Sequence, residues 1–136
     1  MHPQSVIVFV TDQSDCLRLI RHGKTIADER GVQLQVITIQ INCELTPFAT
    51  EQLQKLYNCT QKLGGEMNIL FSQEPALTAA VTAKKLGVTH IVSGVPERTF
   101  INNVRLLLPE IPWTVVESDG KANLYSPLSA AVATPL

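Results

Sequence analysis

Five short runs of apolar, mostly β-branched residues alternate along the chain with longer segments whose apolar residues recur every three or four positions. The first run, residues 6–10, is continuously apolar, which is typical of a strand covered on both faces of a sheet. The other runs lie at residues 34–39, 67–71, 90–94 and 113–116. Strands that alternate with helices across short loops predict a doubly wound α/β fold. Its five-stranded parallel sheet would lie between two helical layers, in a Rossmann-like arrangement.

The helical segments between these runs have recognisable ends. Ser14 is expected to cap the first helix, and Gly31 to end it in a left-handed conformation. Thr46 followed by Pro47 predicts the start of the second helix. The third helix opens at Pro75, and the fourth covers residues 97–108. The residues expected on the buried faces of the third and fourth helices are Leu77, Ala80, Val81, Leu86, Phe100, Val104, Leu107 and Leu108.

One domain accounts for most of the chain. A chain of 136 residues, 45% of them hydrophobic, can bury a single substantial core. We assign residues 1–117 to the α/β domain. Residues 118–136 form a C-terminal tail, because this stretch is rich in Ala, Ser and Pro. Packing of the tail on its own domain and packing on a partner chain both remain open.

Charge and cysteine usage argue against several functional classes. The 11 basic and 12 acidic residues are mixed along the chain, so we expect no binding to nucleic acid or to an anionic membrane. The apolar run at residues 6–10 is too short for a signal peptide or a membrane span, which favours a cytoplasmic protein. The three cysteines form no C-x-x-C pair and the three histidines are scattered, so we expect reduced thiols and no metal site.

The loops after the strands are where a ligand site belongs in such a fold, because parallel strands end at the same edge of the sheet. These loops cover residues 11–15, 40–45, 72–74 and 94–99, and Gly94 is their single glycine. The G-x-G-x-x-G and P-loop patterns are absent, which argues against a standard dinucleotide or P-loop nucleotide site.

No catalytic constellation stands out. Ser93-Gly94 is not a G-x-S-x-G elbow, so a serine hydrolase is not expected. Cys16 is interpreted as a small buried residue, with thiol-based sensing as the minority alternative, because the first turn of a helix can lower a thiol pKa. Asp12 is more often a turn residue than a ligand in such loops. His90 is interpreted as a structural histidine within a strand.

Three segments together resemble a known family. VIVFVTDQSDCLRLIRHGKTIA resembles the opening strand and helix of universal stress proteins, KKLGVTHIVSG resembles the segment around their fourth strand, and IPWTVV resembles their last strand. The similarity runs from about residue 5 to residue 117. Within the family it is closest to a short bacterial branch, similar to the stress-protein module of potassium-sensing histidine kinases.

The resemblance implies strand order 3-2-1-4-5, a homodimer, and a nucleotide across the tips of strands one and four. Thr11 aligns with the acid that contacts the nucleotide in ATP-binding members, although a shift of one residue would place Asp12 there. Gln13 lies in the same loop, and Ile39 takes the backbone position that faces adenine. Ser93 and Gly94 begin the phosphate motif.

The rest of that motif departs from the family pattern. Glu97 stands where the second glycine belongs, and nothing in residues 99–108 supplies the last glycine. A carboxylate opposes phosphates by its charge, and lost glycines oppose them by backbone geometry. The resemblance therefore favours the branch that does not bind ATP.

We therefore expect a cytoplasmic module that binds or signals in the stress response without catalysis. Pairing through the last strand or the C-terminal tail would cover the sheet edge of a homodimer. The alternative is an adenine-nucleotide-binding protein with weak hydrolase activity, and the candidate cofactors are then ATP and AMP.

Overall fold

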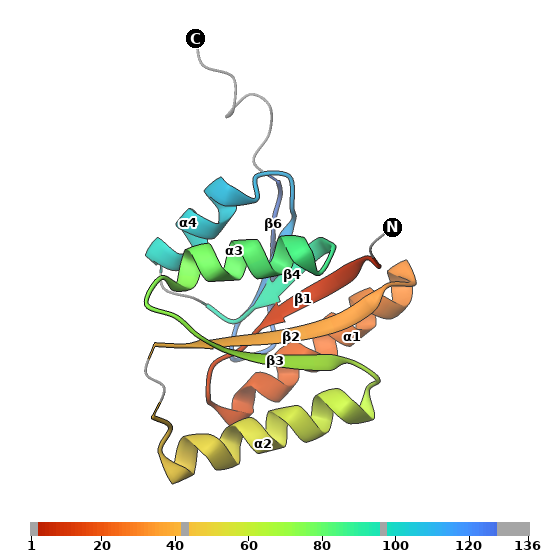
Figure 1. Ribbon diagram of the computed structural model, residues 1–136. Helices are drawn as coiled ribbons and strands as arrows, with labels where there is room; N and C mark the ends of the chain where they lie inside the picture. Colours follow the sequence, from red (N-terminus) through yellow and green to blue (C-terminus); the bar gives the residue numbers. More distant parts are fainter. Residues whose placement is uncertain (1–2, 42–43, 96–97, 128–136) are drawn as a thin grey trace.

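The computed structural model describes residues 3–41, 44–95 and 98–127, and the side chains of Ser14 and Arg98 lie outside that description. A central sheet separates two helical layers (Figure 1). The strands are β1 (Ser5–Phe9), β2 (Gln33–Gln40), β3 (Glu66–Phe71), β4 (Val88–Ser93), β5 (Trp113–Val116) and β6 (Ala122–Tyr125). The helices are η1 (Ser14–Cys16), a short 3-10 turn, and α1 (Leu17–Arg30), α2 (Pro47–Lys62), α3 (Pro75–Lys85) and α4 (Arg98–Leu107).

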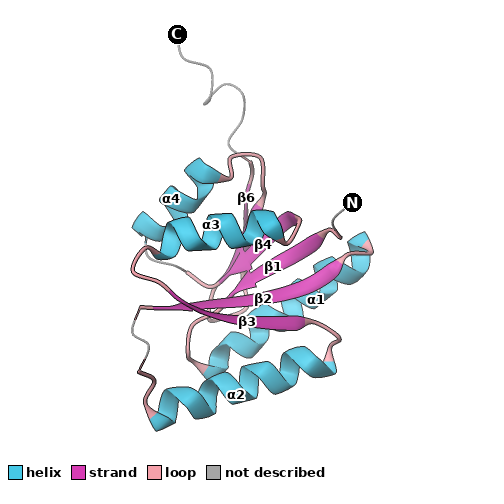
Figure 2. Cartoon of the chain, in the orientation of Figure 1, coloured by secondary structure: helices cyan, strands magenta, loops and turns pink. Residues whose placement is uncertain are grey.

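The sheet has the order β3-β2-β1-β4-β5-β6. β1 pairs in parallel with β2 through Phe9 and Ile37, and with β4 through Phe9 and Ser93. β2 pairs with β3, and β4 with β5, also in parallel. The predicted order of the first five strands is confirmed, and β1 lies at the centre with helices on both faces (Figure 2).

The prediction of five strands, all parallel, is wrong in one respect. β6 pairs antiparallel with β5, from Trp113 opposite Tyr125 to Val116 opposite Ala122, so the sheet is mixed and has six strands. A tight turn at Asp119-Gly120 reverses the chain. Gly120 has a φ of +89°, and its N–H donates to the carbonyl of Glu117 at 2.8 Å. The first part of the stretch assigned to a tail is therefore a strand on its own sheet, while residues 128–136 lie outside the described residues.

Each helical layer covers its own apolar cluster. α1 and α2 pack through Leu19, Leu53 and Leu56 on the Val6 and Val8 face of the sheet. α3 and α4 pack on the opposite face, against Ile7 and its neighbours. The two clusters share β1, whose five residues are all buried. Burial on both faces explains why the β1 sequence is continuously apolar instead of alternating.

The helix boundaries predicted at Gly31, at Thr46-Pro47 and at Pro75 are confirmed. Gly31 ends α1 with a φ of 66°, and the Thr46 hydroxyl accepts from the Ala49 N–H at 3.0 Å at the start of α2. The start of α1 differs, because residues 14–16 form the 3-10 turn and Cys16 takes the cap position without a side-chain cap bond.

The buried face of α3 also differs from the prediction. Leu77 and Val81 are exposed, and so is Leu107 on α4. The side chains of α3 that pack on the sheet are Ala79, Ala80 and Ala83. Small side chains let a helix approach its neighbours closely, so α3 packs through its alanines and presents its larger residues outward.

His90 is a structural histidine, as expected. Its Nε2 lies 2.7 Å from the Thr114 hydroxyl, and its Nδ1 lies 3.3 Å from Nη2 of Arg30. The guanidinium is always a donor, so Nδ1 accepts and Nε2–H donates to Thr114. Burial, followed by the neighbouring Arg30 and His22, lowers the pKa of the His90 imidazole from 6.5 to about 4.

The lowered pKa of His90 predicts a loss of stability in acid. In the unfolded chain His90 becomes protonated below about pH 6.5, whereas in the folded protein it stays neutral down to about pH 4. The contribution of neutral His90 to the free energy of unfolding is therefore complete above pH 6.5 and is lost as the pH falls from 6.5 to 4. We expect the free energy of unfolding of His90→Gln to lack this pH-dependent loss, which amounts to about 3 kcal/mol at most. Urea unfolding followed by Trp113 fluorescence at several pH values would measure it. Parallel pH profiles for the two proteins would contradict the assignment.

Candidate functional site

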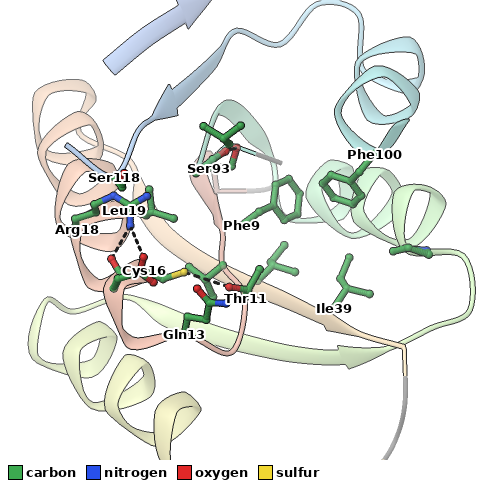
Figure 3. A pocket seen from close by; sticks show the side chains of 16 residues that line it. Phe9, Thr11, Gln13, Cys16, Arg18, Leu19, Ile39, Ser93, Phe100 and Ser118 are labelled. Carbon is green, nitrogen blue, oxygen red and sulfur yellow. Dashed lines mark hydrogen bonds and ion pairs between the residues drawn. The ribbon is translucent and has the colours of Figure 1, made fainter. Parts of the chain in front are cut away.

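A cavity of about 570 Å³ opens where the tips of β1 and β4 lie side by side. The chain leaves β1 toward α1 on one face of the sheet and leaves β4 toward α4 on the other, so the connecting segments diverge at this point. Open α/β sheets bind ligands at such a reversal. The volume lies within the range of small-molecule sites. Figure 3 shows the side chains around it.

Five of the six candidate residues line this cavity. Thr11 and Gln13 come from the loop after β1, Ile39 from β2, and Ser93 and Gly94 from the end of β4. Asp12 instead lines a neighbouring hollow of about 390 Å³, together with Glu44 and Thr46; Thr11 and Ile39 border both spaces. The structure therefore brings the two predicted loops together and places the Asp12 carboxylate to one side.

One side of the cavity is aromatic and aliphatic. Phe9 and Phe100 meet edge to face with their ring centroids 5.8 Å apart, and Ile37 and Ile39 complete the wall. Trp113 packs behind them, with its ring centroid 5.9 Å from that of Phe9. Trp113 itself is buried in the core.

The hydroxyl of Ser93 is already engaged. It accepts a hydrogen bond from the Trp113 indole N–H at 2.8 Å and donates to the carbonyl of Gly94 at 2.8 Å. These two hydrogen bonds fix the end of β4. The remaining lone pair of the hydroxyl oxygen can accept a hydrogen bond from a ligand.

Cys16 is one of the residues that line the cavity. Its side chain is 6% exposed, and its Sγ lies 3.5 Å from the Thr11 hydroxyl. The thiol faces the cavity but is packed in the cluster beneath α1, which agrees with the interpretation of a small buried residue.

Arg18 lines the cavity, and the sequence reasoning missed it. Its guanidinium donates from Nε to the Glu117 carbonyl at 3.2 Å and from Nη2 to the Val116 carbonyl at 3.2 Å. Nη1 donates to the Asp15 carbonyl at 2.8 Å and to its carboxylate at 3.3 Å. These bonds tie the first turn of α1 to the end of β5. No local pattern reveals them, because Val116 and Glu117 lie almost a hundred positions further along the chain.

The described residues after Gly94 do not supply the further glycines of the phosphate motif that the family resemblance implies. α4 begins at Arg98, four positions after Gly94, so helix occupies the stretch where glycines would be needed. Glu97, the carboxylate expected to oppose phosphates, lies outside the described residues. The described residues that follow Gly94, which are Val95 and helix α4, contain no glycine and therefore do not form a glycine-rich cradle.

The described residues hold no cluster of three or more His, Cys, Asp or Glu side chains that would suit a metal ion. Within the same residues, no helix is both long enough and apolar enough to cross a membrane.

Several of the solved structures that this chain resembles are universal stress proteins. One, from Archaeoglobus fulgidus, superposes with a TM-score of 0.61 at 23% identity and covers 78% of this chain and 88% of its own. A universal stress protein from the same organism, in complex with dAMP, gives 0.60 at 22% identity, over 78% of this chain and 92% of its own. A universal stress protein in complex with cAMP gives 0.60 at 14% identity, over 87% and 99%.

No family model matches the chain, and no curated protein matches it. At these identities, the structural likeness shows that the chain has the α/β fold of universal stress proteins.

The buried position of Cys16 predicts an unreactive thiol. In a Cys43→Ser, Cys59→Ser background, we expect iodoacetamide to alkylate the native protein no faster than a free peptide cysteine, because the thiol is packed and contacts Thr11. Mass spectrometry over neutral pH would follow the reaction, with the urea-unfolded protein as the control. Faster alkylation of the native protein would favour thiol-based sensing instead.

Proposed function

We propose that this chain is a universal-stress-protein-like module that binds a small ligand between the tips of β1 and β4 and signals without catalysis. The observation that carries the proposal is the cavity at the reversal of the sheet, formed without a glycine-rich phosphate loop. The shared fold supports the family, and the branch close to the kinase-associated modules remains part of the proposal. The proposal also includes a role in the stress response and a cytoplasmic location.

The chemistry of the cavity walls supports binding over catalysis. Asp15, Cys16 and Arg18 are the titratable side chains among its described lining residues. Asp15 is paired with Arg18, the Cys16 thiol is buried, and the Ser93 hydroxyl donates its proton to a carbonyl. General acid–base or nucleophilic catalysis needs a base within hydrogen-bond reach of a nucleophile, and these contacts supply none.

The proposal predicts no binding of ATP. Titration calorimetry should give no micromolar affinity for ATP, with or without magnesium, because residues 95–108 contain none of the glycines that would let the backbone approach the phosphates closely. Phosphate release from ATP should not exceed that of a blank without protein. Micromolar binding of ATP that is lost in Asp12→Ala would overturn the proposal in favour of the nucleotide-hydrolase alternative. Glu29→Ala is the control, because Glu29 is an exposed carboxylate on α1 that does not line the hollow.

The alternative has its own support, since two of the similar structures contain adenine nucleotides, dAMP and cAMP. Nucleotide extraction from freshly purified, denatured protein addresses it directly. A stoichiometric adenosine triphosphate in the extract would favour this alternative.

A homodimer is also part of the proposal. β6 occupies the outer edge of β5, so pairing through β5 is closed, and β3 forms the other edge with Ile69 and Phe71 exposed. An open, apolar strand edge is a ready surface for a second chain. We therefore place the dimer contact at β3.

Light scattering at high micromolar concentration should give twice the mass of the chain. Phe71→Glu at the β3 edge should produce monomers, whereas Leu124→Glu on β6, the matched control, should leave the dimer intact. A monomer in the unmodified protein would refute the dimer, and dissociation by Leu124→Glu alone would move the contact to β6.

A further inference from the structure

Helices α3 and α4 lie on the same face of the sheet (Figure 1), and an apolar groove is open to solvent between them. Its volume is about 580 Å³, and its apolar walls come from Pro75, Ala76, Leu77, Phe100, Leu106 and Leu107. Leu77 is 47% exposed, Leu107 50% and Leu106 69%. Single exposed apolar residues are common on protein surfaces, whereas a group of them in a groove marks an interaction site.

The chain leaves β6 at one end of this groove. The carbonyl of Ser126 accepts a hydrogen bond from Nη2 of Arg105 on α4 at 2.6 Å, and the Arg105 guanidinium lies 5.5 Å from the centroid of the Tyr125 ring. Arg105 directly precedes Leu106 and Leu107. The residues that follow Pro127 therefore begin at the end of α4 that carries the two leucines of the groove.

The sequence of residues 128–136, LSAAVATPL, suits an apolar groove. It contains no charged side chain, and its three large apolar residues, Leu128, Val132 and Leu136, recur at every fourth position. Residues four positions apart share a face both in an extended chain and in a helix. The segment can therefore present one apolar face to a neighbouring surface, whichever conformation it adopts.

The length and charge of the segment also fit. α4 has ten residues, so it is about 15 Å long. The nine residues 128–136 span up to about 30 Å when extended, so they can follow α4 from its last turn back to its first. Among the described residues that line the groove, Glu74 alone is ionisable, so an uncharged segment leaves few charges without solvent there.

The segment is joined to the domain beside the groove, which favours it over a separate molecule. A tethered segment has a high effective concentration at a site within its reach, so it binds there with little of the entropy cost of association. Covering the groove would also remove exposed leucine side chains from water.

We propose that residues 128–136 pack into the groove between α3 and α4 of their own chain, with their apolar face against Leu77, Leu106 and Leu107. Pro75 and Phe100 line both this groove and the cavity at the tips of β1 and β4. The docked segment therefore also packs against a ring that forms part of the cavity wall. This contact does not depend on which ligand the cavity binds.

A spin label tests the contact in the full chain. Ala133→Cys, in the Cys43→Ser, Cys59→Ser background, would carry a nitroxide next to the apolar face of the segment but not on it. The background protein treated with the same reagent corrects for label attached to Cys16.

The label should broaden the methyl resonances of the groove in NMR spectra. We expect Leu77, Leu106 and Leu107 to lose most of their signal intensity. Leu53 and Leu56 are the controls, because they lie in the cluster on the opposite face of the sheet and should keep their intensity. Undiminished groove signals, or equal broadening on both faces, would overturn the proposal and leave the groove open to another protein.

A mixed sample distinguishes the groove of the same chain from that of a second copy. Spin-labelled protein without isotopes and isotope-labelled protein without a spin label would be combined in urea and refolded together. Packing within each chain should leave the groove methyl signals of the isotope-labelled copy sharp. Broadening of these signals would show that the segment binds a second copy, which contradicts packing within the chain.

Substitutions in the segment give an independent measurement. Val132→Asp should release the segment, because it places a charge on the apolar face. The fluorescence of the apolar dye ANS should then rise several-fold, and the ring resonances of Phe100 should shift. Ala131→Asp is the matched control, since it adds the same charge beside that face, and it should leave both signals unchanged.

Equal dye fluorescence and equal Phe100 shifts in Val132→Asp and Ala131→Asp would also overturn the proposal. Each of these outcomes concerns the groove alone. The ligand-binding function proposed for the cavity is tested by the nucleotide measurements above, so the two proposals can fail separately.

Discussion

The pairing of β1 with β2 on one side and β4 on the other is the constraint on which the rest of the structure depends. β1 is buried on both faces, so each face requires its own helical layer. The chain meets this requirement by winding away from β1 in opposite directions. The two layers then separate at the carboxyl ends of β1 and β4, and a cavity opens there as a consequence of the winding.

The chemistry of that cavity is set by hydrogen bonds between elements that are distant in sequence. Trp113 on β5 fixes the Ser93 hydroxyl at the end of β4, and the carbonyl of Val116 holds Arg18 on α1. Such contacts leave the backbone arrangement of the universal stress protein fold unchanged. They place a serine engaged in structural bonds and a guanidinium held by backbone carbonyls beside the cavity.

Much of the fold could be predicted from the sequence, and the errors have identifiable causes. The five parallel strands follow from their apolar runs, and the candidate loops follow from strand direction. β6 was missed because residues 118–136 were assigned to a tail by their content of Ala, Ser and Pro. The Asp119-Gly120 pair within this stretch is a sequence signal for a hairpin turn. On α3, helical periodicity favoured Leu77 and Val81 as buried residues. The sheet instead packs against the smaller alanines, because helix rotation is decided by the neighbouring surfaces.

The sequence by itself determined which segments are strands, where several helices start and stop, and which edge of the sheet holds the candidate site, because these depend on local conformational preference and on the period of burial. Only the tertiary structure decided that Asp12 lies beside the cavity and not in it, and that Arg18 lines it. The position of a side chain around a cavity depends on contacts between residues far apart in the chain. The bonds from Arg18 to Val116 and Glu117 form only after α1 and β5 have packed on the same sheet.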